Sequence, residues 1–142
     1  MENAALLQIA QQAEGPVYVY DANRIKAQYE RLTNAFRGVN QLRLHYATKA
    51  LNNISILKYI QSLGAGLDTV SIQEVKLGLV AGFDPSTIIF TPNGVSLNEI
   101  EEVAKLGVQI NIDNLSILEQ FGSKYPEVPV CIRINPHVMA IT

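Results

Sequence analysis

The stretch Val108-Gln109-Ile110-Asn111-Ile112-Asp113 alternates strictly between aliphatic and polar residues. A period of two is typical of a β-strand with one apolar face. A second stretch, Val130-Cys131-Ile132-Arg133-Ile134-Asn135, repeats the pattern, with Cys131, Arg133 and Asn135 on its polar side. Strands that are buried on both faces of an open parallel sheet tend to be apolar throughout. The alternation therefore favours strands that pack against helices on one face and turn the other face to a polar interior.

Outward from these two stretches, predicted strands and helices alternate along the whole chain, with glycines such as Gly64 and Gly107 at the helix ends. We predict strands at residues 17–20, 42–48, 67–70, 87–91, 108–112 and 130–134. We predict helices at residues 3–13, 21–36, 53–63, 71–82, 96–107 and 114–121, the last of them ending at Gly122. Strands that alternate with helices of about ten residues indicate βαβ units and a parallel sheet.

This α/β pattern leaves a choice between an open doubly wound sheet and a (β/α) barrel. No Gly-x-Gly-x-x-Gly motif and no P-loop follows any predicted strand, so the usual phosphate motifs of open sheets are absent. Together with the strand alternation, this favours the barrel. A closed (β/α)8 TIM barrel needs eight units and typically about 250 residues, whereas about five units fit here. We therefore expect an N-terminal helix at 1–15 and a partial barrel domain at 16–142.

Composition excludes several classes of protein. The chain has 142 residues, 48% of them hydrophobic, and a net charge of −2. A disordered tail would have fewer apolar residues and a larger net charge, and an electrostatic nucleic-acid binder would have a basic excess. The single cysteine excludes a disulfide framework and a cysteine-rich metal site. There is no signal peptide and no apolar run of the roughly 20 residues that span a membrane, so we expect a cytoplasmic protein.

Lys49 is the main candidate for chemistry. It follows the predicted strand 42–48 and falls on the same side of the alternation as Arg43, His45 and Ala47. We expect it at the carboxyl end of that strand, where parallel barrels place their working residues, and in a desolvated position. Desolvation favours the neutral amine, which can form a Schiff base with a carbonyl compound or with pyridoxal phosphate. On placement alone, a solvated loop lysine is more common.

Five short motifs resemble, in order and spacing, those of the fold-type-III pyridoxal-phosphate decarboxylases. They are Pro16-Val17-Tyr18-Val19-Tyr20-Asp21, Tyr46-Ala47-Thr48-Lys49-Ala50, Gly66-Leu67-Asp68-Thr69-Val70-Ser71, Ala81-Gly82-Phe83 with Ile88-Ile89-Phe90-Thr91, and Ile132-Arg133-Ile134-Asn135-Pro136. The resemblance covers nearly the whole chain from Pro16 onward. It implies an alanine-racemase-like barrel whose C-terminal β domain lies outside this chain, and pyridoxal 5′-phosphate as cofactor.

The resemblance also implies roles for three residues. Lys49 matches the family lysine that holds the cofactor covalently, and Asp68 matches an aspartate beside that linkage. Arg133 matches an arginine that approaches the ring oxygen of the cofactor. The residues alone leave these roles open, because Asp68 could be a turn or cap residue, and Arg133 could neutralise Asp113 or Asp68.

Three further polar residues fit purely structural roles. Glu74 lies three residues after Ser71, which is the spacing of a capping box, and we expect that role for it rather than a catalytic one. We expect His45 to be a packed interior histidine, because a lone histidine does not indicate catalysis. We expect Cys131 to be a small buried residue.

The activity that the resemblance implies is decarboxylation of meso-diaminopimelate to L-lysine and CO2 by a homodimer. Ornithine, arginine and carboxynorspermidine are alternative substrates within the family, and a non-catalytic barrel that binds pyridoxal phosphate is an alternative of another class. The family's phosphate loop, stacking histidine and cross-dimer residues are expected after Thr142. We therefore expect residues 1–142 alone to be inactive and to fold poorly. We expect the protein to bind no metal, no nucleic acid and no membrane.

Overall fold

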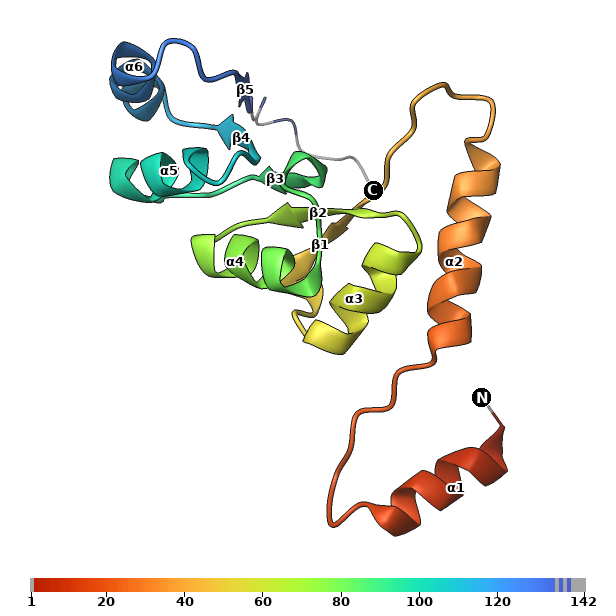
Figure 1. Ribbon diagram of the computed structural model, residues 1–142. Helices are drawn as coiled ribbons and strands as arrows, with labels where there is room; N and C mark the ends of the chain where they lie inside the picture. Colours follow the sequence, from red (N-terminus) through yellow and green to blue (C-terminus); the bar gives the residue numbers. More distant parts are fainter. Residues whose placement is uncertain (1, 135, 137, 139–142) are drawn as a thin grey trace. The chain divides into compact units, whose positions relative to one another are not determined.

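The computed structural model describes residues 2–134, 136 and 138. The chain divides into two compact units, Met1–Leu42 and Arg43–Thr142. The first unit contains α1 (Asn3–Gln12) and α2 (Ala22–Ala35), and the second contains a parallel sheet with its helices (Figure 1). None of the helices in the described part of the chain is long and apolar enough to cross a membrane.

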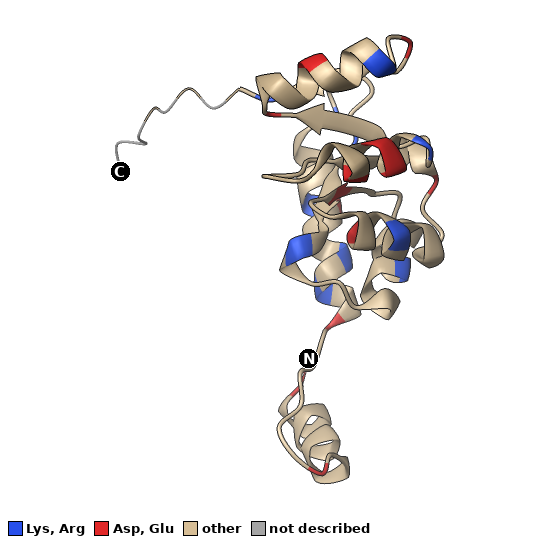
Figure 2. Ribbon diagram, turned by 90° about the vertical axis from the view of Figure 1, so that its left-hand side faces the viewer, with Lys and Arg blue, Asp and Glu red and all other residues tan. Residues whose placement is uncertain are grey.

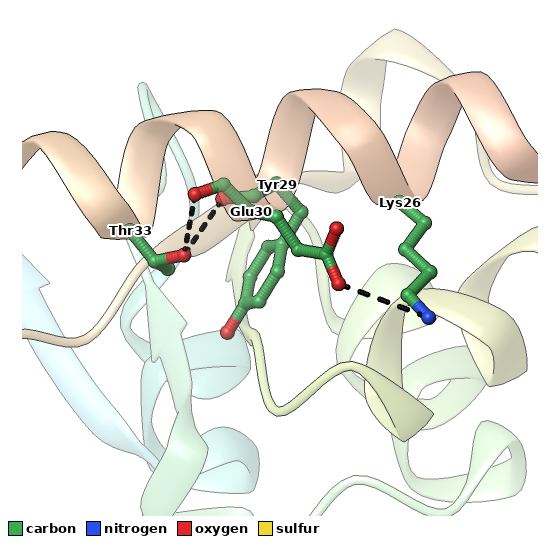
Figure 3. Close-up of polar contacts among 4 residues, drawn as sticks. All are labelled: Lys26, Tyr29, Glu30 and Thr33. Carbon is green, nitrogen blue, oxygen red and sulfur yellow. Dashed lines mark hydrogen bonds and ion pairs between the residues drawn. The ribbon is translucent and has the colours of Figure 1, made fainter.

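Helix α2 begins and continues as its sequence predicts. The Asp21 carboxylate accepts hydrogen bonds of 3.0 and 3.2 Å from two backbone N–H groups of the first turn, which otherwise lack partners in a helix. Farther along, the Thr33 hydroxyl donates to the Tyr29 carbonyl at 3.0 Å, and Lys26 lies 3.7 Å from Glu30 (Figure 3). These contacts lie within the helix itself, so α2 is locally well specified.

The strand predicted at residues 17–20 was wrong. These residues belong to no helix or strand, and Tyr18 is 88% exposed. A strand needs a neighbour for its backbone N–H and carbonyl groups, and none of the described residues pairs with this segment. The apolar and aromatic composition of the segment was therefore not sufficient to specify a strand.

The second unit is built on five parallel strands in the order β1-β2-β3-β4-β5. The strands are β1 (His45–Ala47), β2 (Gly66–Thr69), β3 (Ile88–Phe90), β4 (Gln109–Ile112) and β5 (Val130–Ile132). Each strand pairs with the next one along the chain, so the order never reverses. A doubly wound sheet reverses its order at a switch point, whereas a (β/α) barrel does not. The predicted α/β class and the choice of the barrel are confirmed.

Helices connect the strands and cover one face of the sheet. They are α3 (Ile54–Ser62), α4 (Ile72–Ala81), α5 (Leu97–Ala104) and α6 (Leu115–Lys124), with the short 3-10 helices η1 (Thr48–Ala50) and η2 (Pro85–Thr87). Right-handed crossovers between neighbouring parallel strands place all the helices on the same side. Successive helices contact one another, as Figure 1 shows for α3 to α6.

The core lies between these helices and the sheet. Leu67 of β2 and Ile88 of β3 are fully buried, and a Cβ added to Gly78 of α4 would lie 2.6 Å and 3.3 Å from their Cδ1 atoms. Gly78 therefore allows α4 to lie directly on β2 and β3. The other largest buried side chains come from both layers: Leu57, Val75, Phe90, Ile100, Val103, Ile110 and Phe121.

Ion pairs on the surface link neighbouring helices. The Lys76 amine lies 2.7 Å from Glu102, which joins α4 to α5, and the Lys124 amine lies 2.6 Å from Glu101, which joins α6 to α5. The hydrogen bond with Glu101 raises the pKa of Lys124 above its usual value. Figure 2 shows residues of both signs spread over the helices of the second unit.

Apart from the segment 17–20, the predicted elements differ from the observed ones mainly at two places. Helix α6 continues through Gly122 to Lys124, although we predicted its end at Gly122. Phe121 is 1% exposed and its ring centroid lies 5.1 Å from that of Tyr125, and this anchoring outweighs the roughly 1 kcal/mol that a glycine costs within a helix. Strand β1 is shorter than predicted at both ends, because it begins only at His45 and the chain turns into η1 at Thr48.

Candidate active site

The two faces of the sheet carry different side chains. The register aligns Ile112 with Ile132 and Asn111 with Cys131. Ile112 is 2% exposed and borders the same depression as Ile117 of α6, so it points toward the helices. Because side chains alternate along a strand, Asn111 and Cys131 project from the opposite side, which we call the open face. The alternation predicted from the sequence is confirmed for β4, whose Ile110 and Ile112 are buried while Gln109 and Asn111 are not.

Lys49 lies in η1, directly after β1, at the carboxyl edge of the sheet. Ala47, the last residue of β1, pairs with Asp68 of β2. Lys49 comes two residues after Ala47, so it follows the strand that neighbours the strand of Asp68. The Lys49 side chain is exposed, and the expectation that it is desolvated was wrong for the described structure. The chain turns after Ala47, so the strand alternation does not extend to Lys49 and does not direct its side chain inward.

The turn that carries Lys49 is held on both sides. Thr48 is fully buried, and its hydroxyl has no hydrogen-bond partner among the described residues. On the other side, the Tyr46 hydroxyl donates to the Leu51 carbonyl at 3.2 Å, and the Leu51 N–H donates to the Thr48 carbonyl at 3.1 Å. A fixed backbone below an exposed amine is an arrangement that can present the amine to a ligand at the edge of the sheet.

Asp68 takes part in a hydrogen-bond chain that crosses three strands. The Thr91 hydroxyl, just after β3, donates to Asp68 Oδ1 at 2.8 Å, and the Asn111 amide of β4 donates to Thr91 Oγ1 at 3.0 Å. All three residues are half-buried. Asp68 lies inside β2 and bonds across strands, so it is not a turn or cap residue.

Arg133 lies at the far end of the sheet from Lys49. Its backbone N–H donates to the Ile112 carbonyl at 2.9 Å, and its exposed side chain lines a depression of about 270 Å³ that Asp113 also lines. Two strands lie between β5 and β2, so these strands are about 14 Å apart at the usual spacing. The structure thus places Lys49 and Asp68 on neighbouring strands and does not bring Arg133 to them. Asn135, predicted on the same side as Arg133, lies outside the described residues.

Glu74 has the capping role predicted for it. The Ser71 hydroxyl oxygen accepts a hydrogen bond of 3.3 Å from the Glu74 N–H, and the Glu74 carboxylate accepts one of 2.8 Å from the Val70 N–H. In a standard capping box the carboxylate accepts a hydrogen bond from the N–H group of the cap residue itself. Here the Glu74 carboxylate accepts from Val70, the residue before the cap residue Ser71. These hydrogen bonds explain the position of the Glu74 side chain at the start of α4 without a catalytic role.

His45 and Cys131 differ in how they met expectation. His45 is half-buried, and its Nδ1 lies 3.2 Å from the Leu67 carbonyl oxygen, as expected of a histidine packed against the next strand. Cys131 is exposed, so the prediction that it is buried was wrong. The reason is its position on β5, which is the outermost strand of the described sheet.

Sequence reasoning did not identify Thr91 and Asn111 as site residues. A usable signal was present, because each lies near the carboxyl end of a strand and on the side of the alternation that Asp68 shares. Asn111 also shows an unusual feature that sequence could not reveal: its Oδ1 atom is buried without a hydrogen-bond partner among the described residues. Within the same residues, no cluster of histidine, cysteine or carboxylate side chains could hold a metal ion.

The chemistry of this edge follows from its groups. A primary amine and a carboxylate on neighbouring strands suit the capture of an aldehyde as a Schiff base, in which the carboxylate can balance the positive nitrogen. The hydrogen bonds of Thr91 and Asn111 fix one side of that carboxylate.

Comparison with known proteins gives a consistent family. Residues 22–142 match the family model described as "Pyridoxal-dependent decarboxylase, pyridoxal binding domain". The chain is similar to the diaminopimelate decarboxylase of Methanothermobacter thermautotrophicus, with 36% identity over 96% of this chain and 32% of that protein.

Solved structures agree with the sequence matches. The structure of diaminopimelate decarboxylase from Helicobacter pylori complexed with L-lysine has a TM-score of 0.83 and 33% identity over 94% of this chain and 35% of that one. The lysine/ornithine decarboxylase of Vibrio vulnificus, complexed with putrescine, has a TM-score of 0.81 and 26% identity over 92% of this chain and 36% of that one. The chain spans about a third of the length of these relatives.

Proposed function

Because the chain belongs to the pyridoxal-dependent decarboxylases and carries the pyridoxal-binding domain of that family, we propose that it is part of an enzyme that converts meso-diaminopimelate to L-lysine and CO2. The observation that carries this proposal is the similarity of almost the whole chain to diaminopimelate decarboxylases. The relative from Helicobacter pylori that was solved with L-lysine supports the same product.

The residues at the carboxyl edge of the sheet suit pyridoxal phosphate as the cofactor. Lys49 offers an exposed amine for the cofactor's aldehyde, and Asp68 offers a carboxylate on the neighbouring strand. The Oδ1 atom of Asn111, which has no partner among the described residues, is a buried acceptor of the kind that a binding site retains for a ligand or a further side chain. When bound, pyridoxal phosphate supplies the electron-withdrawing ring that lets the carboxylate of an amino acid leave as CO2.

Each proposed site residue has a separate task. Lys49 would hold the cofactor covalently through its side-chain amine. Asp68 would supply a carboxylate on the strand next to the one that leads into Lys49. Arg133 would donate hydrogen bonds to the ring oxygen of the cofactor, and this would require that β5 curve toward β1 as strands do in a barrel.

We extend the proposal to the organisation of the protein. Residues 16–142 form part of a (β/α)8 pyridoxal-binding barrel, and the working enzyme is a cytoplasmic homodimer. Residues 1–142 alone are inactive, because five strands cannot close a barrel of eight. The similarity in fold to the lysine/ornithine decarboxylase of Vibrio vulnificus supports a second candidate, a decarboxylase of the same family with another substrate.

A substrate panel tests the proposal. A full-length protein that contains residues 1–142, loaded with pyridoxal phosphate, is assayed for CO2 release from meso-diaminopimelate, ornithine, arginine, lysine and carboxynorspermidine. We expect the kcat/KM for meso-diaminopimelate to exceed the others at least tenfold, which corresponds to about 1.4 kcal/mol of transition-state binding. Preference for another substrate would favour the second candidate, and cofactor binding without CO2 release would indicate a non-catalytic barrel.

A further inference from the structure

The hydrogen-bond chain from Asn111 through Thr91 to Asp68 has a fixed direction. An ionised aspartate only accepts hydrogen bonds, and the Nδ2 group of an asparagine only donates them. A threonine hydroxyl has a single proton. Thr91 must therefore donate its proton to Asp68 Oδ1 at 2.8 Å and accept from Asn111 Nδ2 at 3.0 Å.

This direction determines which carboxylate oxygen of Asp68 remains available. Thr91 lies on the β3 side of β2 and occupies Oδ1. Strand β1 lies on the other side of β2, where Ala47 pairs with Asp68 and Lys49 follows two residues later. Oδ2 is thus left for the side of the sheet that carries the Lys49 amine.

Asn111 shows that the arrangement is not explained by packing alone. Its amide nitrogen is used by Thr91, while its Oδ1 atom is buried and has no partner in the described part of the chain. A buried acceptor without a donor destabilises a folded protein, because its lost hydrogen bond to water is not replaced. Exceptions of this kind in folded proteins often mark sites with a functional constraint.

We propose that Thr91 and Asn111 are positioning residues, which hold the Asp68 carboxylate toward the nitrogen of Lys49. The proposal rests on the proposed function, in which Lys49 binds pyridoxal phosphate. This role requires no contact of either residue with the cofactor. Asn111 aligns the Thr91 hydroxyl, and Thr91 fixes the carboxylate, so the effect of Asn111 passes entirely through Thr91.

The test follows the visible absorbance of bound pyridoxal phosphate as a function of pH in the full-length protein. Asp68→Asn removes the negative charge beside the Lys49 nitrogen and is the reference for a lost carboxylate. The quantity compared is the midpoint pH of the absorbance change. We expect Thr91→Val and Asn111→Ala to move this midpoint in the same direction as Asp68→Asn, each by about half a pH unit to one unit. Thr91→Ser, which keeps the hydroxyl, is expected to stay at the wild-type midpoint.

Thr69 provides a matched control. It lies next to Asp68 on β2, is fully buried, and its hydroxyl donates to the Ile89 carbonyl at 2.9 Å. Thr69→Val therefore removes a hydrogen bond of the same kind from the helix side of the same strand, and we expect no shift of the midpoint. In the Thr91→Val background, Asn111→Ala should add no further shift, because the two residues act in series.

The outcomes separate this proposal from the proposed function. A wild-type midpoint for Thr91→Val beside a shifted Asp68→Asn would overturn the positioning role, as would equal shifts for Thr91→Val and Thr69→Val. If Thr91→Val does not fold, Asn111→Leu, which has about the same shape but no hydrogen-bond donor and no charge, must give the shift instead. The proposed function is tested by a separate measurement. A protein that binds the cofactor but releases no CO2 would contradict the proposed function and not the positioning role.

Discussion

Strands β4 and β5 have the same alternating sequence and different surroundings. Ile112 of β4 and Ile132 of β5 are register partners on the helix side of the sheet, yet Ile112 is 2% exposed and Ile132 is 59% exposed. Strand β4 has neighbours on both sides, with α5 and α6 against it, whereas β5 is the outermost described strand. The alternation determines which face a side chain belongs to, and the neighbouring elements determine whether that face is buried.

The site shows the same difference. Asp68, Thr91 and Asn111 lie on the inner strands, and hydrogen bonds hold each of them. Arg133 and Cys131 lie at the edge and are exposed. Hydrogen bonds between side chains on adjacent strands need both strands in place, so the polar chain is complete only in the middle of the sheet.

The largest expected effect comes from substituting the two isoleucines. If residues 1–142 unfold cooperatively in urea, Ile112→Ala should lower their free energy of unfolding by about 2–5 kcal/mol, because it leaves a cavity in the core. Ile132→Ala, the matched substitution on the register partner, should change it by less than about 0.5 kcal/mol, because the side chain is exposed. Urea denaturation of both variants measures the difference.

In the full-length protein, we expect the difference between the two isoleucine substitutions to disappear. There the next βα unit should cover Ile132, and we expect Ile132→Ala to cost about as much as Ile112→Ala. If Ile132→Ala were costly already in residues 1–142, or harmless in the full-length protein, burial by neighbouring elements would not be the cause of the difference.

Substitutions of two helical glycines should have effects of intermediate size, and they compare an exposed site with a packed one. Gly122 of α6 has open space where a Cβ would be, so Gly122→Ala should raise the free energy of unfolding by about 0.5–1 kcal/mol. A Cβ on Gly78 of α4 would press on Leu67 and Ile88, and we expect Gly78→Ala to give a net loss of about 1 kcal/mol. Thermal unfolding of the two variants should shift in opposite directions, and equal stabilisation by both would contradict close packing of α4 on the sheet.

The smallest effect concerns acid stability near the middle strand. The Asp84 carboxylate accepts hydrogen bonds from the hydroxyl and the backbone N–H of Ser86, which lower the pKa of Asp84 below its usual 3.8. The stabilisation is present above pH 3.8 and is lost as the pH falls through the lowered pKa of the folded state. We therefore expect Asp84→Asn to be less stable than wild type at neutral pH and equally stable in acid. A stability difference that persists unchanged in acid would contradict this sign.

Most of the fold could be predicted from local sequence signals. The caps at Asp21, Ser71 and Ser96 begin helices where expected, because a side-chain oxygen that accepts from a backbone N–H is a local property of the sequence. The segment 17–20 and the end of α6 could not be predicted. The first lacks a neighbouring strand, and the second depends on the burial of Phe121 in the tertiary structure.

The site was predicted less completely than the fold. The resemblance identified Lys49 and Asp68, and the structure places them on neighbouring strands. The exposure of Lys49 depends on the turn at Thr48, which the strand pattern does not contain. Thr91 and Asn111 became visible only through hydrogen bonds between strands about 20 residues apart in sequence, which no single segment of the sequence specifies.

The covalent attachment of the cofactor tests the central claim most directly. The full-length protein is incubated with pyridoxal phosphate, reduced with borohydride and digested, and the modified peptide is identified by mass spectrometry. We predict the pyridoxyl group on Lys49, with Lys58 of α3 and Lys76 of α4 unmodified, because only Lys49 of these three follows a strand at the carboxyl edge of the sheet. A pyridoxyl group on Lys58 or Lys76, with Lys49 unmodified, would contradict the account.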